Sequence, residues 1–492
     1  LLSSLWQSFK EAVLNNEYVL LWRQKHPRSI LFFQARLDRT AFSGLMLSLL
    51  TLAFFYVIAL LSGVVEDLIT SDPIVEADIR IANLFFVFRA DPLTAIFSWI
   101  TLLGKSQVVL VFIALSVALL WLWRKNDYLY PLFIAVIGSG IFTYLGKLAF
   151  HRPRPELAVY AENYFSFPSG HATIAVALYG FLGYLLIRFT RSWSRKVNIL
   201  FATIVIIMAI GFSRIYLGVH YISDVWSGYL VGAMWLIIAI SFSEWLKHKN
   251  RKKISGSPIK AIRPISFGLI LTAILFYVGF AVSYHPPLAS VPANNAVIVS
   301  ESTDIFVTEQ IKYTETLIGE RQQPVNFIFL ARNDDQLIGA LQQSGWSLTD
   351  KANVLSFGKA VNALISKTAY PSAPIFPSFW NTKTQDFSLS KMTGENTFNH
   401  SQHLRIWRTN SLLKTGSHIY VAISNTIDGL KWELIPKISP DLDAAREQLY
   451  LDLNDSKMIE SQIKTQLVEP LIGTNFMGSQ FFTDGKIYII TF

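Results

Sequence analysis

The sequence predicts an all-α bundle of membrane-spanning helices, followed by a soluble mixed α/β domain. Hydrophobic residues make up 52% of the 492 positions and charged residues only 16%, well below the roughly 25% charge of an ordinary soluble domain. Most of the long apolar runs lie before residue 287, and the remaining chain resembles a soluble domain in composition. A chain of this length is sufficient for two or three domains.

Seven apolar segments are candidates to cross a bilayer, for which about 20 helical residues are typical. They cover residues 41–63, 108–123, 129–150, 172–187, 197–212, 225–245 and 265–282, which corresponds to about seven spanning helices. A shorter apolar stretch, 92–103, is expected to form a helix that lies at the interface or packs on the bundle.

Charges between the apolar segments predict the orientation. Basic residues gather before the first span and in the connections at 124–125, 188–196 and 247–263, whereas residues 64–91 are acidic on balance. If the seven spans alternate, all the basic segments fall on one side, which the positive-inside rule assigns to the cytoplasm. Residues 64–91 and the whole C-terminal part then lie outside.

The predicted organisation follows from these segments. It comprises a cytoplasmic connector (1–40), a first transmembrane helix and extracytoplasmic loop (41–79), a helical membrane domain (80–247), a basic loop and last transmembrane helix (248–285), and an extracytoplasmic α/β domain (286–492). In the last of these, strands are expected at 327–330, 419–423 and 487–492, and helices at 334–344 and 439–453.

Composition also excludes several classes of function. The net charge of +9 could suggest nucleic-acid binding, but the basic residues lie in short clusters between apolar runs, so we expect no nucleic-acid partner. The chain has no cysteine, which excludes disulfides, thiolate chemistry and cysteine-ligated metal centres.

Polar residues stand at the ends of three apolar segments, where ionisable side chains are costly and are functional candidates. The first group is Lys147 with Arg154–Pro155, the second is Pro168–Ser169–Gly170–His171, and the third is Ser213–Arg214 with His220 and Asp224. All three fall on the extracytoplasmic side of the predicted topology, on two connections between spans. They can therefore converge on one pocket.

The cations of these groups suit a phosphoryl group. Lys147, Arg154 and Arg214 supply fixed positive charge, and a guanidinium matches phosphate oxygens bidentately. Ser169 and Gly170 stand where a loop is expected to become a helix, and a helix N-terminus favours an anion.

The two histidines supply the reactive groups. His220 and Asp224 are four residues apart and share one face of a helix, so the carboxylate can orient the imidazole and leave its other nitrogen free to attack phosphorus. His171 can protonate the leaving oxygen as a general acid. This chemistry requires no metal and no cofactor.

At every one of these positions the sequence resembles the type 2 phosphatidic acid phosphatase superfamily, whose signature is K-x6-R-P, P-S-G-H and S-R-x5-H-x3-D. The resemblance covers about residues 80–245. It implies a six-helix phosphatase core and metal-independent hydrolysis of phosphate esters. It also implies His220 as nucleophile, Asp224 as its orienting partner and His171 as acid. The six-residue spacing selects Arg154, and leaves Arg152 as an auxiliary phosphate or head-group contact at best.

Two further resemblances flank this region. The tail from about residue 304 is similar to the LssY-like C-terminal domain that follows such phosphatases in bacterial membrane proteins. The first 40 residues are similar to the connector after a DedA-type transporter domain, which suggests a DedA-type domain upstream in the full-length chain.

Each single residue also has a structural reading. One arginine or lysine near a helix end is more often a head-group anchor, Ser169 could serve only as a helix cap, and His220 with Asp224 could be a structural pair. Their joint occurrence at family spacing favours the functional reading. In the tail, His403 and Arg405 lie close to His400, and a second polar group comprises Asp441, Asp443 and Arg446; a solvated polar surface is the favoured reading of both groups.

The sequence therefore predicts a bacterial inner-membrane lipid phosphatase with its site on the periplasmic face. Candidate substrates are phosphatidic acid, phosphatidylglycerol phosphate and undecaprenyl pyrophosphate. Two alternatives remain open: a lipid phosphotransferase that uses the same phosphohistidine, and a non-catalytic transport or scaffold protein.

Overall fold

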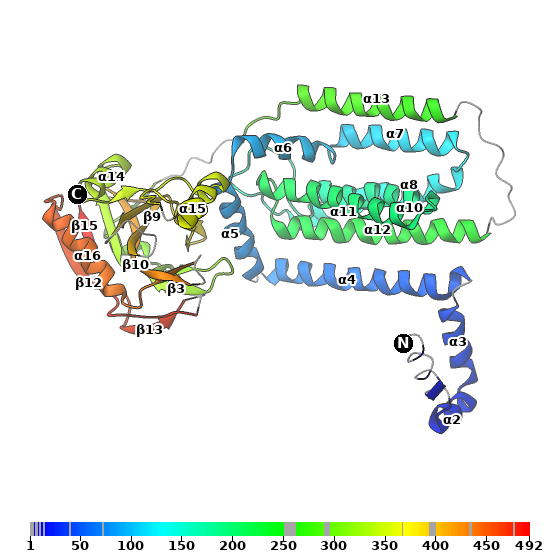
Figure 1. Cartoon of the computed structure of the whole chain (residues 1–492), viewed down its shortest axis with the longest axis horizontal. Coiled ribbons are helices and arrows are strands. Elements are labelled where there is room, and N and C mark those ends of the chain that lie inside the picture. Colours follow the sequence, from blue (N-terminus) through cyan, green and yellow to red (C-terminus); the bar gives the residue numbers. More distant parts are fainter. Residues whose placement is uncertain are drawn as a thin grey trace.

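The fold combines a bundle of long helices with a β-rich part that packs against one end of it (Figure 1). The structure is a computed structural model. It describes residues 15–38, 41–70, 73–249, 262–289, 296–366, 368–392, 400–431, 435–475 and 478–492, together with residues 4, 8, 11 and 12. The basic loop predicted at 247–263 therefore lies largely outside the described residues.

The helical part begins with two short helices and continues with the bundle. Its helices are α2 (Glu17–Lys25), α3 (Pro27–Leu37), α4 (Leu47–Thr70), α5 (Pro73–Val87), α6 (Asp91–Leu102), α7 (Ser106–Leu122), α8 (Leu129–Phe150), α9 (Gly170–Ile174), α10 (Gly180–Phe189), α11 (Trp193–Tyr216), α12 (Ile222–Lys249) and α13 (Ile262–Ser283). Short π or 3-10 turns at Phe42–Met46, Asn126–Tyr128 and Ala175–Tyr179 precede α4, α8 and α10.

The described residues contain six helices long and apolar enough to span a membrane. A seventh span results if α6 and α7 are counted together across their 46° bend. The predicted multi-pass helix bundle with a sheet-rich C-terminal part is thus confirmed. The expected span at 108–123 corresponds to α7, and the apolar stretch 92–103 forms α6, which starts with Pro92 in its first turn.

The segment after the first span differs from the prediction. An extracytoplasmic loop was expected up to residue 79, but α4 continues to Thr70 and α5 starts at Pro73. Helix α5 is stabilised by contacts on both sides, because Asp78 and Arg80 are each 1% exposed and each has a charged partner far away in the sequence. The sequence around α5 does not indicate these distant partners. For this reason, residues 64–91 resemble an acidic loop when the sequence is considered alone.

The β-rich part is built on one nine-stranded sheet with the order β12-β15-β4-β10-β9-β8-β5, to which β1 and β11 add at β9 and β10. Two smaller sheets have the orders β3-β2-β6-β7 and β13-β14. The strands are β1 (Val297–Val299), β2 (Tyr313–Glu315), β3 (Arg321–Pro324), β4 (Phe327–Ala331), β5 (Ser347–Leu348), β6 (Phe379–Trp380), β7 (Lys383–Thr384), β8 (Phe387–Met392), β9 (His400–Leu413), β10 (His418–Lys431), β11 (Ile435–Ile438), β12 (Ser461–Gln466), β13 (Leu471–Thr474), β14 (Gln480–Thr483) and β15 (Lys486–Thr491).

Three helices accompany these strands: α14 (Asp334–Gln343), α15 (Val354–Ser366) and α16 (Leu442–Asp455). The side chains of Asn333 and Asp441 cap α14 and α16 by accepting hydrogen bonds from backbone amides in the first turn. The strands and helices that were predicted in this part are confirmed, as is its mixed α/β character.

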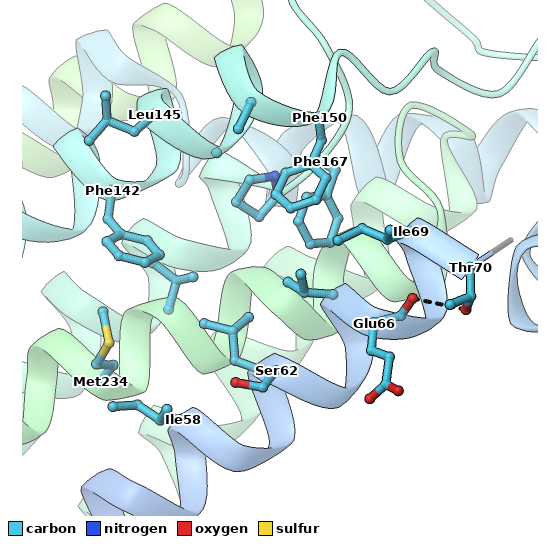
Figure 2. A pocket seen from close by; sticks show the side chains of 16 residues that line it. Ile58, Ser62, Glu66, Ile69, Thr70, Phe142, Leu145, Phe150, Phe167 and Met234 are labelled. Carbon is cyan, nitrogen blue, oxygen red and sulfur yellow. Dashed lines mark hydrogen bonds between the residues drawn. The ribbon is translucent and has the colours of Figure 1, made fainter. Parts of the chain in front are cut away.

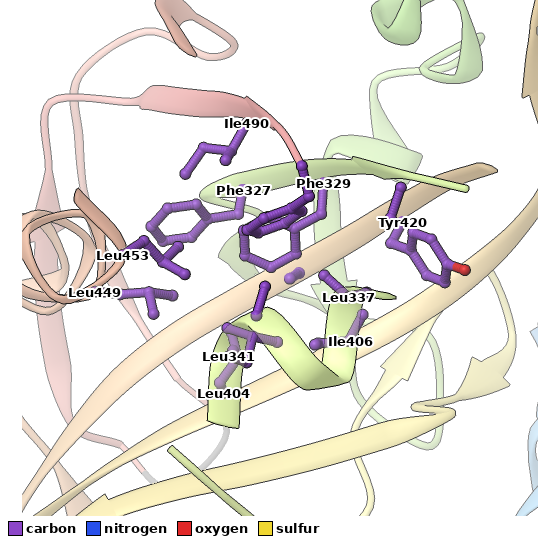
Figure 3. Close-up of a cluster of buried hydrophobic side chains, with 14 of the residues drawn as sticks. Phe327, Phe329, Leu337, Leu341, Leu404, Ile406, Tyr420, Leu449, Leu453 and Ile490 are labelled. Atoms are coloured by element: carbon purple, nitrogen blue, oxygen red, sulfur yellow. The ribbon is translucent and has the colours of Figure 1, made fainter. Parts of the chain in front are cut away.

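The main core of this part lies between the sheet and helices α14 and α16 (Figure 3). Phe327 and Phe329 of β4 pack against Leu341 of α14 and Leu449 of α16, and all four side chains are fully buried. Burial of each such side chain contributes about 1.5–3 kcal/mol. This core positions the long strands β9 and β10, which pair with each other along most of their length.

The two parts meet at α5. Arg80 donates to the Glu315 carboxylate of β2 through Nε at 3.0 Å and through a second, shorter contact from Nη2. Glu315 also accepts from the Thr382 amide at 2.6 Å, and Asn83 of α5 donates to the Thr382 carbonyl at 2.9 Å. Thr382 has a φ of 65°, which is unfavourable for a β-branched residue, so these contacts hold a strained turn between β6 and β7.

We expect Arg80→Ala to loosen this junction. Removing one partner of a buried ion pair typically costs about 3–5 kcal/mol, because the other charge stays buried without compensation. The variant should unfold at a lower temperature in detergent and should be cut faster by protease between residues 285 and 315. Glu76→Gln is the matched control, since Glu76 pairs with the same arginine but has 61% of its side chain exposed, and it should leave both measurements close to wild type.

Candidate active site

Three segments bring the predicted site residues together at the end of the bundle next to the β-rich part. Lys147 lies in the last turn of α8, Arg154 in the loop after it, and Ser169 directly before α9. Arg214 lies in the last turn of α11, and His220 in the short loop that joins α11 to α12. The loop after α8 folds back onto the loop after α11, because Arg154 donates to the Val219 carbonyl at 2.5 Å.

His220 is held between a carboxylate and a guanidinium. Its Nδ1 lies 3.3 Å from Oδ2 of Asp224, and its Nε2 lies 3.3 Å from Nη1 of Arg154. The ring is 2% exposed. Burial lowers the pKa of His220 well below its ordinary value, and the charges of Arg154, Arg214 and Lys147 act in the same direction. The imidazole is therefore neutral at pH 7 and keeps a lone pair.

Asp224 is fully buried at the start of α12 and has two further partners. Its Oδ2 accepts from the Tyr221 amide at 2.9 Å, and its Oδ1 binds Arg152 at 2.7 Å. The Asp224 carbonyl accepts from the Ser169 amide at 2.9 Å, which joins the second motif to the third. That amide is consequently not free to bind an anion, contrary to the simplest reading of the sequence.

The sequence suggested that Arg152 is an auxiliary phosphate contact, but in the structure it pairs with two carboxylates. Its guanidinium is 7% exposed and lies between Asp224 and Asp78, with ion-pair distances of 2.7 Å on both sides. Ser223 adds a hydrogen bond from Arg152 at 2.7 Å and a shorter one to Asp78. Asp78 was missed in the sequence, where it appeared only as one of several acidic residues in a predicted loop.

Arg214 is 0% exposed and is surrounded by polar partners. It donates to Thr101 at 2.8 Å, to the hydroxyl of Tyr160 and to Glu162 at 2.9 Å. Glu162 also lies 3.7 Å from Arg154, so one carboxylate spans two of the proposed phosphate-binding cations. Burial alone would raise the pKa of Glu162, but Arg214 and Arg154 lower it to about 2, and the group is an anion at neutral pH. The sequence offered no spacing that separates Glu162 from the nearby Glu156.

Several buried polar atoms at this site have no hydrogen-bond partner among the described residues. They include Oγ of Ser169, Nε2 of His171 and Nε of Arg214. Buried polar groups normally have partners, so three such atoms in one place indicate room for a polar ligand. Lys147 adds a further cation at the edge and donates to the Phe165 carbonyl. Among the described residues, no group of three or more acidic, histidine or cysteine side chains could hold a metal ion.

A largely apolar cavity of about 750 Å³ lies beside this cluster, between α4, α8 and α12 (Figure 2). Ile58 of α4 and Met234 of α12 lie opposite Phe142 of α8, whereas Ile69 of α4 lies at the other end of the cavity, beside Phe150 and Phe167. Phe167 and Pro168 also line the cavity and directly precede Ser169. The cavity therefore extends from the lipid-facing surface of α4 to the start of the second motif.

Comparisons with known proteins identify relatives of both parts of the chain. Residues 128–248 match the model of the PAP2 superfamily, and residues 307–487 match that of the LssY C-terminus. The chain is 30% identical over 188 residues to phosphatidylglycerophosphatase B of Bacillus subtilis (strain 168), covering 37% of this chain and 92% of that enzyme.

Two crystal structures are also similar to the chain. A transmembrane PAP2-type phosphatidylglycerolphosphate phosphatase from Bacillus subtilis is 26% identical, with 40% of this chain and 97% of that chain covered and a TM-score of 0.36. LpxE of Aquifex aeolicus is 25% identical, with 32% and 92% covered and a TM-score of 0.28.

The two family matches confirm the resemblance to the phosphatase superfamily and the resemblance of the tail to the LssY C-terminal domain. The relationship to the B. subtilis enzyme confirms the expected enzyme class, a phosphoric ester hydrolase. The chain belongs to the PAP2 superfamily of membrane phosphatases.

Proposed function

We propose that this protein hydrolyses the phosphate ester of a membrane lipid through a covalent phosphohistidine on His220, without a metal, on the periplasmic face of a bacterial inner membrane. The observation that carries this proposal is the cluster of cations around a buried, neutral histidine. Lys147, Arg154 and Arg214 face one carboxylate, Glu162, and this excess of positive charge suits a phosphate anion.

The geometry supports an ordered division of roles. Nε2 of His220 attacks phosphorus while Asp224 retains the proton on Nδ1 and stabilises the cation that develops. The bond from phosphorus to the ester oxygen breaks, and His171 gives that oxygen its proton. Water then attacks the phosphohistidine and passes a proton to His171, which releases inorganic phosphate and restores both rings.

The phosphoryl oxygens are expected to replace the Glu162 carboxylate on Arg154 and Arg214. The unpaired Oγ of Ser169 and Nε of Arg214 supply further hydrogen bonds, and Gly170 lets the phosphate approach the start of the helix closely. Contacts that strengthen as charge moves to the equatorial oxygens stabilise the transition state.

The apolar cavity beside the site supports a lipid substrate. Acyl chains can lie between α4, α8 and α12 while the head group reaches Ser169 past Phe167 and Pro168. The name of the related phosphatidylglycerophosphatase B makes phosphatidylglycerol phosphate the first substrate to assay, followed by phosphatidic acid and undecaprenyl pyrophosphate. An upstream DedA-type domain stays a prediction.

The central test is phosphate release in detergent from these lipids. Wild type should release phosphate from at least one of them, and His220→Ala should lose activity by about 10⁴-fold or more, as expected for loss of a covalent nucleophile. EDTA should leave the wild-type rate unchanged, because no step uses a metal. A rate that falls on chelation and returns with a divalent ion contradicts the metal-free mechanism.

The same assay separates the alternatives. Transfer of the phosphoryl group to an added lipid or sugar alcohol, without free phosphate, indicates a phosphotransferase. A stable wild-type protein without turnover on any lipid, and without a trapped phosphohistidine after acid-free denaturation, supports a non-catalytic role instead.

A second test concerns Asp78, which we propose as a positioning residue because it contacts Arg152 but not the phosphate pocket. Asp78→Asn keeps the shape but removes the charge that balances Arg152. Hydrogen bonds to charged groups contribute about 1.5–3 kcal/mol, so kcat should fall by about 10–100-fold while KM changes little. Asp91→Asn is a control on the exposed start of α6 and should retain wild-type kcat. A comparable rise in KM with an unchanged kcat would contradict the positioning role, and so would kinetics equal to those of wild type.

Orientation can be tested directly, because the chain has no cysteine. Single cysteines are introduced at Glu156, in the exposed loop beside the site, and at Arg191, in the exposed connection between α10 and α11. In spheroplasts, a membrane-impermeant maleimide should label the Glu156→Cys protein at once and the Arg191→Cys protein only after permeabilisation. The reverse pattern would show that the site faces the cytoplasm.

A further inference from the structure

The β-rich part contains a second cavity, of about 760 Å³, that is separate from the catalytic site. It lies between the turn that joins β2 and β3, the segment 374–379, and strands β9, β10 and β11. Its volume falls within the ~300–1,000 Å³ that is typical of small-molecule sites. No residue of the three phosphatase motifs lines it.

Arg405 of β9 is the main charged group in the wall of this cavity. Its one described hydrogen bond is long, from Nε to the Phe376 carbonyl at 3.4 Å, and it has no ion pair among the residues that the structure describes. Burial lowers the pKa of Arg405 to about 10, so the guanidinium remains charged at neutral pH. A partly buried cation without a counter-charge favours an anion in the adjoining space.

Two buried amide side chains provide an independent sign of a missing ligand. Asn425 is 1% exposed and Gln323 is 4% exposed, and both line the cavity. Oδ1 of Asn425 and Nε2 of Gln323 have no hydrogen-bond partner in the described part of the chain. Together they offer one acceptor and one donor beside Arg405, which matches a head group that carries a hydroxyl as well as an anion.

The rest of the wall combines polar side chains, among them Thr314, Ser378 and His403, with an apolar side that leads to an exposed mouth. Ile423 and Ile427 of β10 form part of the inner wall. At the mouth, Ile318 is 60% exposed, Phe376 is 66% exposed and Leu317 is 37% exposed. Large exposed apolar groups around a cavity are typical of a site for an apolar ligand.

The mouth lies next to the end of the helix bundle. Gly319, which follows Ile318, packs so closely on the Arg80 guanidinium of α5 that a Cβ there would lie 2.9 Å from Nη1. Helix α15 is on the same side, since its Phe357 ring lies 5.9 Å from the Phe88 ring that follows α5. Leu355 and Ile365 of α15 are 77% and 74% exposed, as expected for a helix that rests on a lipid surface.

We propose that this cavity takes up one single-chain anionic lipid from the adjacent membrane surface. The phosphate or carboxylate of the head group pairs with Arg405, a head-group hydroxyl donates to Asn425, and the acyl chain follows the apolar wall to the mouth. Two carboxylates also line the cavity. Glu315 is already bound by Arg80 and by the Thr382 amide. Glu320 is exposed at the rim, and so is Lys437, which has the opposite charge. The proposal concerns binding alone and does not depend on His220 chemistry.

The test uses the purified 492-residue chain in a neutral detergent, with His220→Ala in every variant so that the probe is not consumed. The probe is 1-acylglycerol 3-phosphate with a photoreactive diazirine in its acyl chain, and cross-linked peptides are identified by mass spectrometry. We expect cross-links in residues 314–320 and 374–379. Arg405→Gln should reduce them by about tenfold or more, while cross-links in the bundle stay unchanged.

Two variants of exposed isoleucines keep the test decisive if Arg405→Gln is unstable. Ile318→Gln at the mouth should weaken cross-linking in these segments, whereas Ile298→Gln in β1, which is 68% exposed and does not line the cavity, should have no effect. An excess of inorganic phosphate or of uncharged 1-acylglycerol should compete poorly with the probe. Absence of cross-links in both segments, equal labelling in the Ile318 and Ile298 variants, or full competition by phosphate alone would overturn the proposal.

Discussion

The pairing of Arg152 with two buried carboxylates is the interaction on which the site depends. Asp78, Arg152 and Asp224 are 1%, 7% and 0% exposed, and each charge would be costly at this depth without its neighbours. Because Arg152 occupies Oδ1 of Asp224, Oδ2 is left for the Tyr221 amide and for Nδ1 of His220. The chain of charges therefore fixes the imidazole with Nε2 facing Arg154.

Helix α5 extends this constraint to the second part of the protein. Asp78 and Arg80 are two positions apart, which on a helix separates them by about 200°. One face of α5 thus supports the catalytic histidine through Arg152, and the other binds Glu315. Because Glu315 also lines the cavity that contains Arg405, a single helix joins the walls of the two sites. A shift of α5 would therefore displace residues in the walls of both sites.

The catalytic pocket resolves a conflict between burial and charge. Lys147, Arg154 and Arg214 repel one another, and Glu162 offsets part of this repulsion by spanning Arg154 and Arg214. In the mechanism that we propose, a phosphate competes with that carboxylate for the two guanidinium groups. The neutral His220 follows from the same surroundings, because burial and nearby cations both oppose its protonation.

The sequence by itself determined the spanning helices and the spacing of Lys147, Arg154, His220 and Asp224, because apolar length and helical periodicity are local properties. It also located β4, α14 and α16 through their apolar patterns and caps. Only the tertiary structure decided the role of Arg152, the helical state of α5, and the partners Asp78 and Glu162. These depend on contacts between residues 52, 72, 74 and 235 positions apart. The sequence shows which residues are charged, and a charged residue needs a partner if it is buried. Only the fold decides whether it is buried and which opposite charge it contacts.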